Sequence, residues 1–82
     1  MATKQKAVQA VEAFGGEIDW ANSYVTADQK YIIIDAPEGH IWDATEAATI
    51  TISWFCGSAS ELWDEVIDLV LSGTTRHYSA ES

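Results

Sequence analysis

Residues 30–43 read KYIIIDAPEGHIWD and contain the strongest strand signal in this 82-residue chain. The first six residues are rich in β-branched side chains, which favour a strand. Pro37 and Gly39 then stand at the second and fourth positions of a turn, a pattern typical of a type I turn closed by a glycine bulge. We therefore predict a hairpin in which residues 40–43 form the return strand.

Further strands are expected on both sides of this hairpin. Segments 17–20 and 23–26 indicate one short strand, broken around Ala21 and Asn22, and residues 27–29 form a turn into the hairpin. In residues 48–55, hydroxyl side chains alternate with isoleucine and tryptophan, which predicts an amphipathic strand.

Helices are expected at both ends of the strand region. Residues 3–14 carry an apolar stripe at helical spacing, with Thr3 as the N-cap and a glycine pair directly after Phe14. Ser58 and Glu61 form a capping box that opens a second amphipathic helix, which ends at Gly73. The chain thus has the order helix, strands, helix.

This order predicts an α+β fold, αβββα, with a three- to four-stranded antiparallel sheet and both helices packed on one sheet face. We expect a single domain over residues 1–73 and a polar C-terminal tail over residues 74–82. In the central strand, Tyr31 and Ile33 point to one face and Ile32 and Ile34 to the other, so both faces are apolar and only one of them meets the helices. The face that does not meet the helices is either a dimer or partner contact, or it is covered by the 17–26 segment or by the tail.

The charge balance argues against some classes of function. Thirteen Asp and Glu residues stand against four Lys and Arg, a formal net charge of −9. Direct binding to nucleic acid or to an anionic membrane requires a basic patch that this composition disfavours. The longest apolar run, residues 31–34, is far too short to cross a membrane. A single cysteine allows no internal disulfide, so we expect a cytoplasmic protein.

No motif for catalysis or metal binding is evident. His40, His77 and Cys56 have none of the spacings typical of zinc sites. Cys56 follows Trp54 and Phe55, and we interpret it as a small buried side chain rather than a nucleophile. Trp54 and Trp63 are expected in the core. We therefore predict no enzyme activity, no cofactor and no metal.

An acidic stripe is the most informative functional feature. No positive residue occurs between Tyr31 and Thr75, and the second helix carries acids at positions i, i+3, i+4 and i+7: Glu61, Asp64, Glu65 and Asp68. Either this is an ordinary solvated face, or it is an anionic surface for a basic partner, in which carboxylates take the place of phosphates. Asp43 and Glu46 are further candidates for this partner-binding surface.

Residues 31–42, YIIIDAPEGHIW, followed by a strand, a helix and a short tail, resemble small bacteriophage-encoded accessory proteins. The shared element is the Asp-Ala-Pro-Glu-Gly turn that leads into an aromatic strand. The resemblance implies a protein expressed in the cytoplasm of a bacterial host. It also implies a non-enzymatic binder of host proteins, a class that includes inhibitors of defence nucleases.

These observations lead to two hypotheses of function. The first is a small acidic binding module that inhibits or modulates a host protein by occupying a basic site that normally holds nucleic acid. The alternative is a small homodimeric structural or accessory subunit that uses its exposed sheet face, with the acidic helix serving solubility alone.

Overall fold

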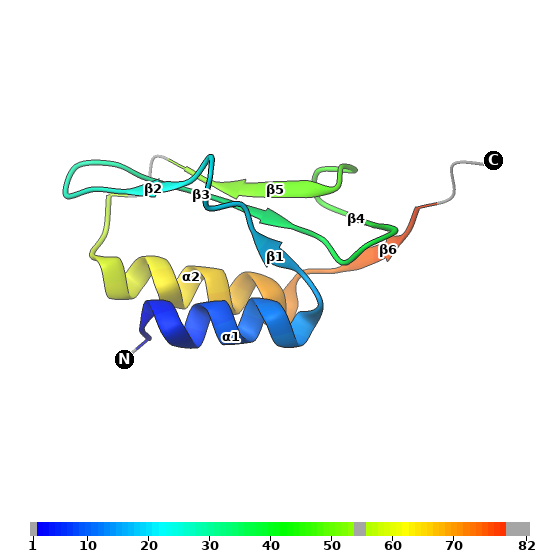
Figure 1. Ribbon diagram of the computed structural model, residues 1–82, viewed down its shortest axis with the longest axis horizontal. Helices are drawn as coiled ribbons and strands as arrows, with labels where there is room; N and C mark the ends of the chain where they lie inside the picture. Colours follow the sequence, from blue (N-terminus) through cyan, green and yellow to red (C-terminus); the bar gives the residue numbers. More distant parts are fainter. Residues whose placement is uncertain (1, 54–55, 79–82) are drawn as a thin grey trace.

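A computed structural model describes residues 2–53 and 56–78. Two helices lie side by side beneath one face of an antiparallel sheet, which confirms the predicted α+β architecture (Figure 1). The elements in chain order are α1 (Lys4–Phe14), β1 (Glu17–Ile18), β2 (Tyr24–Val25), β3 (Lys30–Asp35), β4 (His40–Trp42), β5 (Thr49–Ile52), α2 (Ala59–Ser72) and β6 (Thr75–His77). None of the helices in these residues is long and apolar enough to cross a membrane.

The main sheet is built around β3. Strand β5 pairs with it antiparallel along one edge, from Ile32 opposite Ile52 to Asp35 opposite Thr49. Strands β1 and β2 pair with the other edge end to end, and both are also antiparallel. The short strand interrupted around Ala21 is therefore confirmed. Because β1 and β2 lie beside β3 in the sheet, these two strands do not cover its second face, the one opposite the helices.

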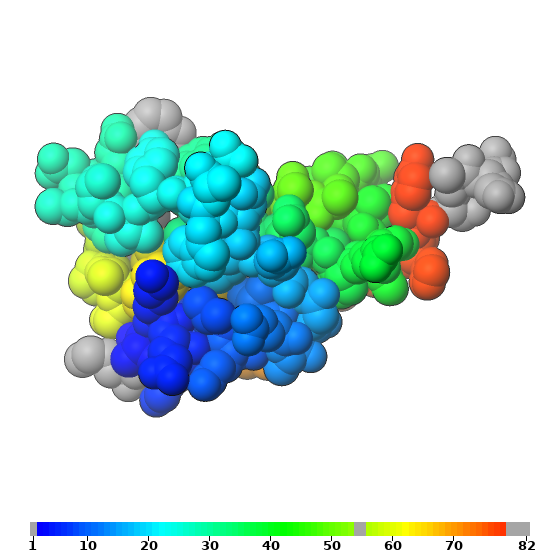
Figure 2. All heavy atoms as spheres, in the orientation of Figure 1, coloured from blue at the N-terminus to red at the C-terminus, as the bar shows by residue number. Residues whose placement is uncertain are grey.

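The interruption between β1 and β2 is a bulge in which residues 19–23 oppose residues 32–33. The N–H of Asp19 donates to the carbonyl of Ile33 at 2.9 Å. The Ser23 hydroxyl donates to the Asp19 carbonyl at 2.6 Å and accepts from the N–H of Ile33 at 3.0 Å. One side-chain hydroxyl thus replaces a missing ladder bond. Figure 2 shows this segment, in cyan, lying against the blue α1.

The predicted hairpin between β3 and β4 is wrong, although its turn forms. Gly39 has a φ of 79°, and the N–H of His40 donates to the Pro37 carbonyl at 2.9 Å. Both edges of β3 are occupied by other strands, so β4 diverges and pairs with β6 instead. Trp42 is thereby buried, 1% exposed, with its Nε1 donating to the Ile34 carbonyl at 3.2 Å.

The C-terminal segment contains a strand that the sequence analysis did not predict. Thr75–His77 forms β6, antiparallel to β4, and Arg76 pairs with Asp43 at 2.5 Å. Three polar residues are too few to show a periodic pattern that predicts a strand. β6 also depends on pairing with β4, which is distant in the sequence. The last part of the expected tail, residues 79–82, lies outside the described residues.

The apolar core fills the space between the sheet and the helices. Its largest fully buried side chains are Val11, Ile32, Ile34, Trp42, Leu62 and Val66. Trp63 is buried as predicted, whereas Trp54 lies outside the described residues. Trp20 is 43% exposed because the bulge carries it to the sheet margin. Cys56 is exposed, contrary to our expectation, because it lies in the connection that leaves the sheet for α2.

Both helices begin as the sequence predicts. The Thr3 hydroxyl accepts from the N–H of Lys6, and Gly15 ends α1 in the left-handed conformation with a φ of 95°. In α2 the capping box is complete: the Ser58 hydroxyl accepts from the N–H of Glu61, and the Glu61 carboxylate accepts from the N–H of Ser58. These local signals fix where each helix starts and hence which residues face the sheet.

Candidate functional site

The predicted acidic stripe lies on the solvent side of α2. All four of its side chains are exposed: Glu61, Asp64, Glu65 and Asp68. Glu61 also has a structural role, because its carboxylate accepts a hydrogen bond from the backbone N–H of Ser58 at 2.8 Å. This bond, aided by the Ser58 side chain, lowers the pKa of Glu61. Glu61 therefore keeps its negative charge at neutral pH.

A groove runs beside the stripe, between α2 and β5. It has a volume of about 250 Å³ and is lined by Ile50, Thr51, Ile52, Glu65, Asp68, Leu69 and Ser72. Isoleucine and leucine side chains supply its apolar part, and two members of the acidic stripe supply its charge. Such a lining suits the apolar stem and charged head of a lysine or arginine.

The backbone of β5 is exposed above this groove. Ile33 directs its N–H and C=O toward the bulge, where they bond Ser23 and Asp19. Thr51 opposes Ile33, so this is a pair without hydrogen bonds between its members, and the N–H and C=O of Thr51 point away from β3. Within the described residues, no strand pairs with that edge of β5.

Asp43 and Glu46 do not join the stripe. Asp43 accepts a hydrogen bond from Arg76, and hydrogen bonds from Thr74 and Arg76 lower the pKa of the Asp43 carboxyl. Its evident role is to hold β6 against β4. Glu46 is exposed in the following turn with a φ of 53°, and its N–H donates to the Trp42 carbonyl at 2.7 Å.

A second acidic cluster, which the sequence analysis missed, surrounds the C-terminal end of α1. Glu12, Glu17, Asp35 and Glu38 line a hollow of about 440 Å³ together with Gly15, Gly16 and Ala36. Burial, and then the charges of Asp19 and Glu17, raise the pKa of Asp35. The only signal that could have revealed this cluster is the pairing of β1 with β3, which places Glu17 opposite Asp35.

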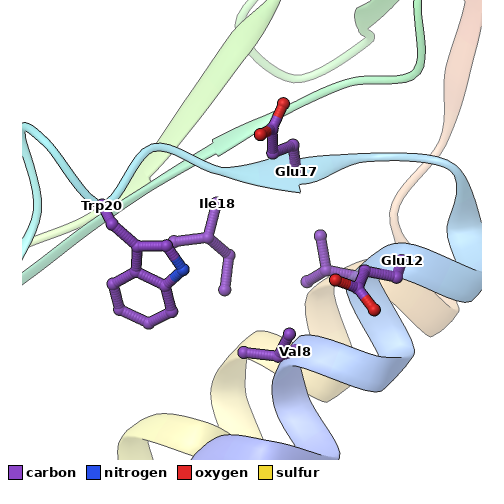
Figure 3. A pocket seen from close by; sticks show the side chains of 6 residues that line it. Val8, Glu12, Glu17, Ile18 and Trp20 are labelled. Atoms are coloured by element: carbon purple, nitrogen blue, oxygen red, sulfur yellow. The ribbon is translucent and has the colours of Figure 1, made fainter.

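A smaller cavity of about 170 Å³ adjoins this cluster between α1 and β1. Figure 3 shows the indole of Trp20 and the carboxylate of Glu12 on opposite sides of it, with Val8 below. Its volume falls short of the roughly 300–1,000 Å³ typical of small-molecule sites. The cavity is therefore poorly suited to a drug-sized ligand.

The positive side chains do little to neutralise these acids. In residues 2–53 and 56–78, the only salt bridge joins Arg76 to Asp43. Lys30 is buried, and the Nζ of Lys4 lies over the ring of Trp20, 4.7 Å from its centroid. Among the described residues, no basic side chain forms a salt bridge with the acids of the stripe or of the second cluster.

Two histidines meet where β4 pairs with β6. The rings of His40 and His77 lie 4.6 Å apart, and the Nδ1 of His40 contacts the Glu38 carbonyl at 3.2 Å. Among the described residues, no group of three or more His, Cys, Asp or Glu side chains is arranged to hold a metal ion.

Comparison of the chain with protein-family models, with curated proteins and with solved structures finds no match in any of the three.

Proposed function

We propose that this protein is a non-catalytic binding module that presents the acidic stripe of α2 to a basic surface on another protein. The observation that carries the proposal is the stripe itself: four exposed carboxylates on one helix, with no salt bridge among the described residues to any of them. An unneutralised row of one sign attracts a surface of the opposite sign and speeds encounter with it.

The stripe lowers the stability of the helix that carries it. Four pairs of like charges stand three or four residues apart: 61 with 64, 61 with 65, 64 with 68, and 65 with 68. Each such pair costs a helix about 0.2–0.5 kcal/mol. Surfaces that serve solubility alone usually mix the two signs, which avoids this cost. Because the stripe keeps this loss of helix stability, a role in binding is favoured over a role in solubility alone.

The carboxylates of the stripe form a row that can take the place of phosphates in a basic site. From Glu61 to Asp68 the row extends over seven helical steps, about 10.5 Å at ~1.5 Å per residue. Its successive members are separated along the helix axis by about 4.5, 1.5 and 4.5 Å, so the proposed mimicry rests on the sign and density of the charges and not on a regular repeat. The resemblance of residues 31–42 to bacteriophage-encoded proteins favours, as the target, a nucleic-acid-binding protein or nuclease in the cytoplasm of a bacterial host. Occupying its basic site would inhibit it.

Capture from bacterial host lysate with matched variants tests this proposal. Immobilised wild-type protein should retain a basic partner at low salt and release it as salt rises. The double variant Asp64→Lys/Asp68→Lys should lose the same partner. A control variant, Asp28→Lys, changes an exposed acid in the β2–β3 turn and should keep it. If the double variant retains the partner as well as the wild type does, the stripe is not the binding surface.

The sheet face opposite the helices supports a second candidate function, a homodimeric subunit. On this face the rings of Tyr24 and Tyr31 stack at 5.5 Å with an interplanar angle of 12°, next to half-buried Ile33. Sedimentation over a concentration series separates the two functions. A salt-insensitive dimer that Tyr31→Ala disrupts would favour the homodimer, and a monomer at all concentrations would exclude it.

A further inference from the structure

We infer that the partner contributes an extended basic segment that adds to the sheet as a new strand beside β5, over the groove between β5 and α2. This inference rests on the proposed function, because it uses two acids of the same stripe. It goes beyond that function by naming the conformation of the bound segment, the edge that receives it and the pattern of its side chains.

The exposed edge of β5 has the groups that strand addition requires. Thr51 directs its N–H and C=O outward, while the hydroxyl of Thr45 donates to the Thr49 carbonyl at 3.0 Å and so marks one end of the available edge. Residues 48–53, ATITIS, contain no charge, proline or glycine. Proteins commonly protect exposed edges with such residues or with bulges. The opposite edge of this sheet has a bulge, at residues 19–23. β5 has neither a bulge nor a charged or proline residue that would protect its edge.

The groove determines which side chains the added strand would carry. Alternate side chains of a strand point to the same face and lie roughly 6.6–6.8 Å apart. Glu65 and Asp68 are three residues apart on α2, and such pairs have Cβ atoms about 5–6 Å apart. Lysine or arginine at every second position can therefore reach one carboxylate each. Their apolar stems would lie along Leu69 and the isoleucines of β5.

The same acids disfavour a second copy of the chain as the occupant. Two β5 strands that paired across a twofold axis would bring Glu65 and Asp68 of each copy toward the same acids of the other. Like charges brought together in this way repel, and the net charge of −9 adds to the repulsion. Charge complementarity therefore selects a basic segment.

A synthetic peptide, acetyl-Lys-Val-Lys-Val-Lys-Val-Lys-amide, tests the inference with the full-length protein labelled with ¹⁵N. Titration should shift the backbone amide signals of Thr49–Ile52, most strongly that of Thr51. Two further peptides carry N-methyl groups on all valines or on all lysines. Only alternate residues of a strand bond a given edge, so one of these peptides should bind about tenfold more weakly or worse and the other should bind normally. Glu65→Lys/Asp68→Lys should abolish binding, and Asp28→Lys should not.

The possible results separate this inference from the proposed function. If both N-methylated peptides bind as well as the unmodified peptide, or if the shifts fall on α2 alone, strand addition is wrong and electrostatic docking to α2 stands. If no peptide binds, strand addition is also wrong, and the lysate capture still decides the function independently. If the Thr51 signal shifts with protein concentration in the absence of peptide, a second copy occupies the edge and the inference is overturned.

Discussion

Replacing Asp68 with lysine should stabilise the folded protein and, at the same time, weaken its binding. Asp68 has two like-charged neighbours on α2, Asp64 four residues before it and Glu65 three residues before it. The substitution removes both repulsions and creates two attractive pairs in the favourable order, with the acid N-terminal to the lysine. It also places a positive charge near the last turn of α2, which has no basic residue.

The magnitude follows from counting these pairs. Two repulsions removed and two attractions gained, each about 0.2–0.5 kcal/mol, give roughly 1–2 kcal/mol of added stability at low salt. The hydrogen bond of the Ser72 hydroxyl to the Asp68 carbonyl, at 2.6 Å, involves backbone at position 68 and should persist. For a domain whose total stability is typically about 5–15 kcal/mol, this gain is readily measured.

Urea unfolding followed by circular dichroism measures this gain. The midpoint for Asp68→Lys should exceed that of the wild type at low salt, and the difference should shrink at about 1 M salt, where the Debye length is ~3 Å. Asp28→Lys lies outside any helix and should change stability by less than about 0.5 kcal/mol. An Asp68→Lys protein no more stable than the wild type at low salt would refute the reasoning that the stripe costs stability.

Three further predictions concern the core, the bulge and the second acidic cluster. Trp42→Ala should lower the free energy of unfolding by about 3–5 kcal/mol, because this ring is 1% exposed, and a loss near zero in urea titration would contradict its place in the core. Ser23→Ala should leave the N–H of Ile33 without its hydrogen bond and cost about 1–3 kcal/mol, with faster hydrogen exchange at that amide as the direct observation. The fold raises the pKa of Asp35, so ionisation of Asp35 destabilises the fold as the pH rises through that pKa. Asp35→Asn should therefore raise the melting temperature at neutral pH but not at low pH, and an equal effect at both would contradict the electrostatic cause.

Local sequence signals predicted much of the fold because their physical causes are local. The capping box at Ser58 involves atoms three residues apart, and the alternation in Thr49–Ile52 needs only one buried face. The partner of β4 could not be predicted in this way. The turn at Gly39 indicates a hairpin, but β5 occupies one edge of β3, and β1 and β2 occupy the other. β4 therefore cannot pair with β3, and its position is instead the one that buries Trp42. These contacts are distant in sequence.

In the candidate site, too, features with local causes could be predicted and features that depend on distant contacts could not. The stripe on α2 could be predicted, because helical periodicity alone aligns Glu61 with Asp68. The groove beside it could not, since the neighbour of α2 at Glu65 is β5, and that depends on the sheet order. The second acidic cluster was missed for the same reason. Glu12, Glu17 and Asp35 come from three elements and meet only in the folded chain.

The central claim is that the acidic stripe of α2 is the surface that binds a basic partner. Titration calorimetry of the captured partner against the wild type and Asp64→Lys/Asp68→Lys tests it most directly, at two salt concentrations and with Asp28→Lys as the control. We predict an affinity that falls with salt, and a loss of about tenfold or more in the double variant, which corresponds to roughly 1.4 kcal/mol. Equal affinities for the wild type and the double variant, unaffected by salt, would contradict the claim.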